Sequence, residues 1–230
     1  EYNKSGFMTY SEMIISYSGL DFKRKSSIKY DSNNLFLEEE TYGYNSDEGD
    51  DYEFMARNNY EYDSSNNIKY VYNVNKDNSN SIESYTYNDD GKLIEIKYNE
   101  LKGVLGEQEI GDLILLTKIS YKENKEITEE YLFDGSFANA TVNYFEDGEL
   151  TESHYYEDNK EELVSVAYFR DKMQYKYDFY YEGVLSSNFK SEYLDNDING
   201  NYTKKIRYKK DAEEKTFKPN VISFWEIEYY

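Results

Sequence analysis

The sequence predicts an all-β protein, a Tyr-rich antiparallel meander of repeated hairpins. The sheet is expected to be twisted or curled, and both an open sheet and a barrel-like shell fit the sequence. Three observations support this. The segment Tyr87–Tyr98 (YNDDGKLIEIKY) places two alternating stretches around a turn, and near-copies of it recur along the chain. A single proline among 230 residues leaves almost every position able to pair. We expect roughly a dozen short strands.

Five copies of the turn share one register. They are YDSNNLF at Tyr30–Phe36, YDSSNNI at Tyr62–Ile68, YNDDGKL at Tyr87–Leu93, YKENKEI at Tyr121–Ile127 and YFEDGEL at Tyr144–Leu150. The fifth residue of the copies is, in chain order, Asn34, Asn66, Gly91, Lys125 and Gly148. Gly adopts positive φ freely, and Asn tolerates it better than most residues. The pattern predicts a type I turn with a G1 bulge, a common three-residue hairpin connection.

Apolar and polar residues alternate on both sides of these turns. Shared faces are expected for Ile68, Tyr70, Tyr72 and Val74, for Ile94, Ile96 and Tyr98, and for Trp225, Ile227 and Tyr229, the last opposite Glu226 and Glu228. Such alternation is typical of strands with one apolar, aromatic face and one charged face. The tract Leu163–Phe169 (LVSVAYF) is apolar at successive positions, which predicts a central strand covered on both sides.

No linker interrupts the chain, so we expect a single elongated β-repeat domain over residues 1–230. Its main interruption is Leu101–Asp112 (LKGVLGEQEIGD), which is Tyr-free and Gly-rich and is interpreted as an insertion forming a long loop or short helix. A second interruption, Asn45–Asp51 (NSDEGDD), is interpreted as an acidic loop.

The charge of the chain restricts its partners. It has 47 acidic and 26 basic residues, a formal charge of −21, which repels phosphate backbones, so we expect no nucleic acid partner. Cations, basic protein surfaces or neutral glycans fit this charge better. The longest apolar runs, Leu113–Leu116 and Val221–Trp225, are far shorter than the roughly 20 residues that span a bilayer, so no transmembrane segment is expected.

Catalytic chemistry has few candidate residues. The chain has no cysteine and one histidine, His154, which excludes thiolate nucleophiles and His-rich or Cys zinc sites. His154 lies in LTESHYY, where the alternation favours a strand residue over a catalytic base. A pair of carboxylates of the glycosidase type is the alternative, although no pair stands out among so many. We expect no catalytic residue and no cofactor.

One segment has part of a calcium-loop pattern. In DNDINGN the oxygen-bearing residues Asp195, Asp197 and Asn199 precede Gly200, as in an EF-hand loop, but the twelfth position is Ile206 rather than a bidentate Glu. The same residue types are also what an ordinary turn requires, so both interpretations stay open. A second acidic group could hold a cation loosely, or simply be solvated: Asp47, Glu48, Asp50 and Asp51. No metal site is predicted.

The element Y-[DN]-x-x-G-x-[LI], repeated from about Tyr30 onward, resembles the YD repeats of RHS-type bacterial proteins. The tail Asp195–Tyr208 (DNDINGNYTKKIRY) with Glu226–Tyr230 (EIEYY) is similar to the end of YD-repeat-like bacterial lipoproteins and secreted proteins of unassigned function. The resemblance implies an exported all-β protein of the cell surface, periplasm or extracellular space, with a lipid anchor upstream of Glu1. It implies no catalytic residues.

Three function hypotheses follow. The leading one is a non-enzymatic exported bacterial envelope protein that acts as a binding or scaffolding module for a protein or glycan. The second is a carbohydrate-binding protein that uses a Tyr-rich sheet face, and the third is a carboxylate-based hydrolase with two buried acids facing one cleft. The Tyr excess also has a purely structural explanation, because cross-strand aromatic pairs stabilise a sheet.

Overall fold

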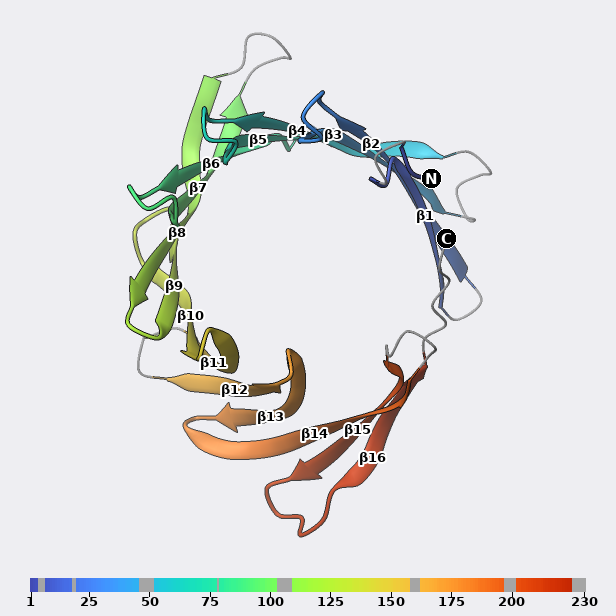
Figure 1. Cartoon of the computed structure of the whole chain (residues 1–230), viewed down its shortest axis with the longest axis vertical. Helices are drawn as coiled ribbons and strands as arrows, with labels where there is room; N and C mark the ends of the chain where they lie inside the picture. The colour runs from blue at the N-terminus through green and yellow to red at the C-terminus, as the bar shows by residue number, and fades with distance from the viewer. Residues whose placement is uncertain are drawn as a thin grey trace. The chain divides into compact units, whose positions relative to one another are not determined.

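The chain forms an all-β antiparallel meander, as predicted from the sequence. The computed structural model describes residues 1–3, 7–17, 20–45, 52–77, 79–102, 109–157, 162–196 and 202–224. These residues contain sixteen strands that lie in the sheet in chain order (Figure 1). The strands are β1 (Tyr10–Tyr17), β2 (Leu20–Tyr30), β3 (Phe36–Asn45), β4 (Glu53–Tyr62), β5 (Ile68–Asn75), β6 (Ser81–Tyr87), β7 (Leu93–Lys102), β8 (Glu109–Lys122), β9 (Lys125–Leu132), β10 (Phe137–Glu146), β11 (Glu149–Glu157), β12 (Leu163–Arg170), β13 (Met173–Tyr181), β14 (Val184–Asn196), β15 (Tyr202–Asp211) and β16 (Lys218–Phe224).

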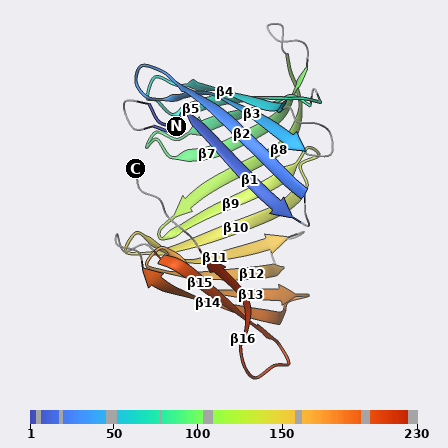
Figure 2. The same ribbon diagram turned by 90° about the vertical axis from the view of Figure 1, so that its right-hand side faces the viewer.

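The chain divides into two compact units, Glu1–Leu116 and Thr117–Tyr230. Within each unit the hairpins follow one another without crossovers, and Figure 2 shows β9 to β13 side by side. Among the described residues there is no helix, and hence none long and apolar enough to cross a membrane.

Three hairpins of the first unit, β2–β3, β4–β5 and β6–β7, share the predicted turn. Its fifth motif residue has positive φ in each case: Asn34 at 64°, Asn66 at 65° and Gly91 at 74°. The amide of that residue donates to the carbonyl of the first turn residue, Asp31, Asp63 or Asn88, at 2.9–3.1 Å. The side-chain Oδ1 of the first turn residue accepts two more amides at 2.8–3.1 Å. With a register shift beside each turn, the type I turn with a bulge is confirmed for these copies.

The other two motif copies use a shorter turn. At β10–β11, Asp147 and Gly148 alone connect the strands and both have positive φ, 51° and 83°, as a type I′ turn requires. At β8–β9, Glu123 has positive φ of 50° and Lys125 is already the first residue of β9. The predicted three-residue turn was wrong for these two copies, because the same spacing also fits strands that continue closer to the turn and leave two residues between them.

One further copy of the turn departs from the repeated sequence pattern. In YLFDGSF, Tyr131–Phe137, Gly135 has a φ of 80° and donates its amide to the Leu132 carbonyl at 2.9 Å, as in the first unit. The turn begins with Leu and Phe where other copies have Asp, Asn or Ser, so its polar signature is weak. Further two-residue turns at Asp171–Lys172 and Glu182–Gly183 raise the number of strands above the dozen expected.

Burial arises from neighbours within the sheet and occurs on both faces. Val71 is 5% exposed and pairs with Glu83, while Ile82 is 3% exposed and pairs with Tyr72 on the opposite face. The prediction of one apolar and one charged face was wrong in this region, because the stems of long polar side chains cover shorter neighbours. In β12, the consecutive residues Ser165 and Val166 are both buried, so the prediction of a central strand covered on both sides is confirmed.

The segment predicted as a loop or short helix is strand at both ends. Leu101 and Lys102 end β7 and residues 109–112 begin β8, although residues 103–108 lie outside the described part. The loop was predicted because the segment has no Tyr. The buried Leu101, however, supports strand pairing as an aromatic residue would. Residues 225–230, with the predicted alternation around Trp225, also lie outside the described part.

In two motif copies of the first unit, the opening tyrosine joins its hairpin to the preceding one. The Tyr62 hydroxyl donates to the Phe36 carbonyl at 2.7 Å, and the Tyr87 hydroxyl donates to the Ile68 carbonyl at 2.9 Å. Phe36 and Ile68 each follow the turn of the preceding copy by one or two residues. Burial raises the pKa of both Tyr62 and Tyr87. The repeat therefore supplies a turn and a hydrogen bond that holds successive hairpins together.

Removing one of these hydroxyls should weaken the first unit. We expect Tyr62→Phe and Tyr87→Phe each to lower the free energy of unfolding by about 1 kcal/mol, the usual net contribution of one hydrogen bond. Urea denaturation measures the loss. Tyr70→Phe is the matched control, because the Tyr70 hydroxyl has no hydrogen-bond partner among the described residues. Equal losses in all three variants would contradict the role of the repeat tyrosine.

Candidate ligand-binding site

The strand β15 concentrates basic residues within an acidic chain. Its segment KKIRYKK, Lys204–Lys210, holds five of the 26 basic residues. Because successive side chains of a strand point to opposite faces, Lys205, Arg207 and Lys209 share one face. Three cations therefore lie in a row along one side of this strand.

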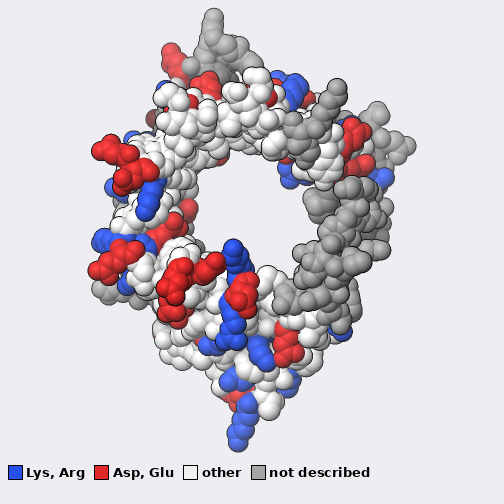
Figure 3. All heavy atoms as spheres, viewed as in Figure 1, with Lys and Arg blue, Asp and Glu red and all other residues white. Residues whose placement is uncertain are grey.

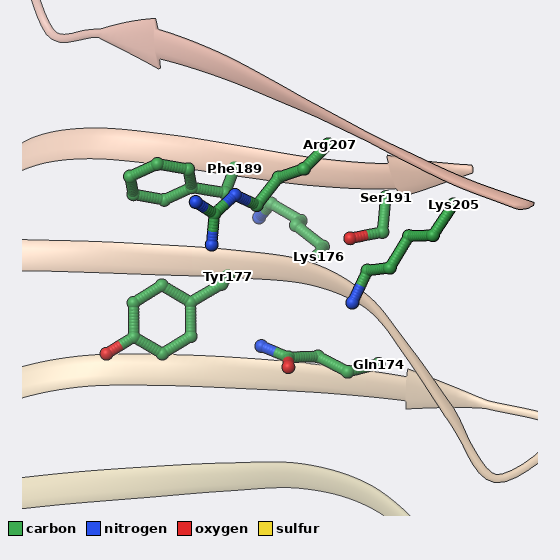
Figure 4. A pocket seen from close by; sticks show the side chains of 7 residues that line it. All are labelled: Gln174, Lys176, Tyr177, Phe189, Ser191, Lys205 and Arg207. Atoms are coloured by element: carbon green, nitrogen blue, oxygen red, sulfur yellow. The ribbon is translucent and has the colours of Figure 1, made fainter. Parts of the chain in front are cut away.

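Aromatic and hydroxyl side chains lie beside this row. In the β14–β15 register Phe189 pairs with Lys209, Ser191 with Arg207 and Tyr193 with Lys205, and in β13 Tyr177 pairs with Phe189. A depression of about 330 Å³ opens on this face (Figure 4). We call it the basic depression; its lining residues are Gln174, Lys176, Tyr177, Phe189, Ser191, Lys205 and Arg207.

A β-bulge brings Gln174 into the basic depression. The β12–β13 pairing shifts from Tyr168–Lys176 to Phe169–Gln174, which leaves Tyr175 as the extra residue. Tyr175 and Lys176 then both contact Tyr168 on the opposite face, with ring centroids 6.5 Å apart and the Lys176 ammonium 4.2 Å from the Tyr168 centroid. Gln174 thereby shares the face of Tyr177, which strict alternation would not allow.

Two of the three cations that line the basic depression, Lys205 and Arg207, contact rings rather than acids. The Arg207 guanidinium lies 5.5 Å from the centroid of Phe189, and the Lys205 ammonium lies 5.1 Å from that of Tyr193. Within the described part of the chain, neither has a carboxylate at ion-pair distance. Figure 4 shows both side chains extending from β15 across β14 toward the residues of β13. Their charge is thus available to a ligand.

Many basic groups elsewhere are paired with acids. Examples are Lys29 with Glu38, Arg57 with Glu40, Lys102 with Asp112, Lys190 with Glu192 and Lys209 with Asp211. On the face that Figure 3 displays, acidic and basic side chains are interspersed. Lys25, Lys69, Lys118, Lys125 and Arg170 also contact rings and have no ion pair among the described residues. What distinguishes Lys205 and Arg207 is that both line the same depression.

A buried polar network lies on the other face of β13 and β14. Asp178, whose side chain is 5% exposed, accepts hydrogen bonds from the Lys176 ammonium and the Asn188 amide, both at 2.7 Å. Burial alone would lower the pKa of Lys176, but the hydrogen bond and charge of Asp178 outweigh it and raise that pKa. The network occupies the Lys176 ammonium and holds β13 and β14 in register beneath the basic depression.

His154 occupies a strand position in β11. It pairs with Val142 and Val166, its Nε2 lies 2.8 Å from a Glu152 carboxylate oxygen, and its ring centroid is 4.7 Å from that of Tyr144. These are the contacts of a residue in a β-ladder, which agrees with the sequence interpretation.

The metal candidates lie largely outside the described residues. Asp195 belongs to the end of β14, whereas Asp197, Asn199 and Gly200 are not described, and neither is the acidic group of Asp47, Glu48, Asp50 and Asp51. Across the described ranges, His, Asp and Glu form no group of three that could hold a metal ion.

Comparisons with known proteins give a fold and no family. No protein-family model matches the sequence, and no curated protein matches it at significant similarity. A porin-like protein from Bacteroides uniformis ATCC 8492 has a similar structure, with a TM-score of 0.55 and 11% identity over 94% of each chain. A protein of unknown function from Bacteroides fragilis NCTC 9343 aligns with a TM-score of 0.31 and 16% identity, over 65% of this chain and 94% of that one. The first likeness is one of fold and agrees with the antiparallel meander.

Proposed function

We propose that this chain is a non-enzymatic exported protein of the bacterial envelope that acts as a binding module, with the basic depression as its ligand site. The observation that carries the proposal is that Lys205 and Arg207 line one depression together, where each contacts a ring and neither has an ion pair among the described residues. A neighbouring carboxylate would satisfy such cations at little cost. Its absence among the described residues leaves both charges for a ligand.

The size and composition of the basic depression fit a small ligand group. Its volume of about 330 Å³ lies near the lower end of ligand sites, which run from roughly 300 to 1,000 Å³. It combines a ring, an amide, a hydroxyl and two available cations, so it offers both an apolar surface and a few orienting polar groups, as such sites do.

Two further observations support an envelope location. The YD-repeat resemblance implies an exported, anchored protein. The structure from Bacteroides uniformis that shares this fold is described as porin-like. A scaffolding role is compatible with the same location, but the basic depression favours binding.

The hydrolase hypothesis has less support. A carboxylate mechanism needs two acids flanking one cleft. Among the described residues, Asp178 is the one buried acid, and its two oxygens are occupied by Lys176 and Asn188. The basic depression itself is lined by no carboxylate.

Thermal unfolding in the presence of envelope components tests the proposal. A ligand at 100 times its Kd should stabilise the folded chain by about 2.7 kcal/mol and raise Tm. Purified chain is screened against neutral oligosaccharides, acidic oligosaccharides, peptidoglycan fragments and short peptides. We expect a saturable rise that Ser191→Phe, which fills the basic depression, abolishes and that Ser84→Phe, a matched change in β6, retains. No saturable rise with any class, or a rise that Ser191→Phe leaves intact, would contradict the proposal.

A further inference from the structure

We infer that the ligand of the basic depression is an acidic saccharide, a sugar residue that carries a carboxylate. This inference rests on the proposed binding function and specifies its ligand.

Arg207 supplies the group that would recognise the carboxylate. A guanidinium is planar and presents paired N–H donors in its plane, which match the two oxygens of a carboxylate. The contact with Phe189 involves the ring, and no carboxylate of the described chain competes for the guanidinium. Its in-plane N–H groups are therefore free to donate.

Lys205 adds a second positive charge at one end of the same face. It lies two residues before Arg207 in β15, a rise of roughly 7 Å, and its side chain extends toward Gln174 (Figure 4). The ammonium donates without directional preference. The Lys205 ammonium therefore attracts a carboxylate in several positions, whereas Arg207 fixes the orientation of that carboxylate.

The neutral residues point to a sugar rather than a bare anion. The Gln174 amide both donates and accepts hydrogen bonds, and the Ser191 hydroxyl does the same, as sugar hydroxyls require. The Tyr177 ring offers an apolar surface for the C–H face of a pyranose. An inorganic anion would accept hydrogen bonds from Gln174 and Ser191 but would leave the Tyr177 ring and the acceptor oxygens of both groups unused.

The space suits one small ligand group. The basic depression holds about 330 Å³, near the lower end of the roughly 300 to 1,000 Å³ of ligand sites. The formal charge of −21 repels every anion at long range, and it repels a polyanion such as nucleic acid more strongly than a short acidic oligosaccharide. A single acidic sugar residue, alone or within an oligosaccharide, matches both the space and the local charge.

Calorimetry with matched sugars tests the inference. The probes are uronic acid trimers of the galacturonate, glucuronate and mannuronate series, each with the neutral hexose trimer of the same linkage, which differs at C6 alone. We expect at least one uronic acid trimer to bind at least tenfold more tightly than its neutral counterpart. Arg207→Gln should weaken that binding at least tenfold and leave neutral sugars unaffected.

The control variant is Lys209→Gln, which removes a cation from the same strand and face. Lys209 is paired with Asp211 and does not line the basic depression, so its loss should leave affinity unchanged. Equal affinity for acidic and neutral trimers, or an equal loss in both variants, would overturn the inference. If no trimer binds while another envelope component raises Tm through the basic depression, the ligand class is wrong and the binding function stands. If nothing raises Tm, both fail.

Discussion

Replacing Asp178 with alanine is expected to lower the free energy of unfolding of the second unit by about 2–3 kcal/mol. The carboxylate is buried and accepts one hydrogen bond from a charged donor and one from Asn188. Hydrogen bonds to charged groups contribute about 1.5–3 kcal/mol, and a partner left unsatisfied in a buried site adds to the loss. Asn188, which is 8% exposed, would lose its acceptor.

Urea denaturation of Asp178→Ala measures this loss, and Asp211→Ala is the matched control. Asp211 pairs with Lys209 but its side chain is 54% exposed, so its removal should cost less than about 1 kcal/mol. The raised pKa of Lys176 sets a pH window for the effect. The stability that the protonated Lys176 contributes is fully present below pH 10.5, the ordinary pKa of a lysine. It is lost as the pH rises through the higher pKa of Lys176 in the folded state. Similar losses in both variants would show that the buried network is not a major contributor.

Replacing Gly91 with valine is expected to destabilise the first unit by roughly 1–3 kcal/mol. Gly91 has a φ of 74°, and a Cβ at this position would meet no atom within 4 Å. The penalty therefore comes from the backbone alone, because a β-branched residue is strained in the left-handed region. Gly148→Val, at a φ of 83°, should show a comparable loss in the second unit.

Asn66→Gly is the control for the glycine prediction. Asn66 occupies the same turn position with a φ of 65°, where glycine is unstrained, so stability should change by no more than a few tenths of a kcal/mol. The measurement is the urea midpoint of each variant. An unchanged midpoint in both valine variants would contradict the assignment of these turns.

The strands were predictable because their signals are local. Alternation over a few residues marks each strand, and the spacing from tyrosine to glycine marks each turn. The turn type at Gly148 was not predictable, since the strands pair as far as Glu146 and Glu149, which shortens the loop without changing the spacing from tyrosine to glycine. The faces of β5 and β6 were mispredicted because burial of Val71 and Ile82 depends on neighbouring strands.

The basic depression was only partly visible in the sequence. The alternation of Lys205, Arg207 and Lys209 is a local signal, but the net charge of −21 predicts cationic and neutral ligands for the chain as a whole. Tyr177 and Ser191 reach the site through pairing with other strands, and Gln174 reaches it only through the bulge at Tyr175. No short stretch of sequence contains that information.

The most direct test of the central claim is an NMR titration of the isotopically labelled chain with the tightest-binding uronic acid trimer, following backbone amide shifts. A ligand in the basic depression should produce its largest shifts in β13, β14 and β15, at Gln174, Tyr177, Ser191 and Arg207. Saturable binding with its largest shifts in the residues before Leu116 would place the site elsewhere and contradict the account.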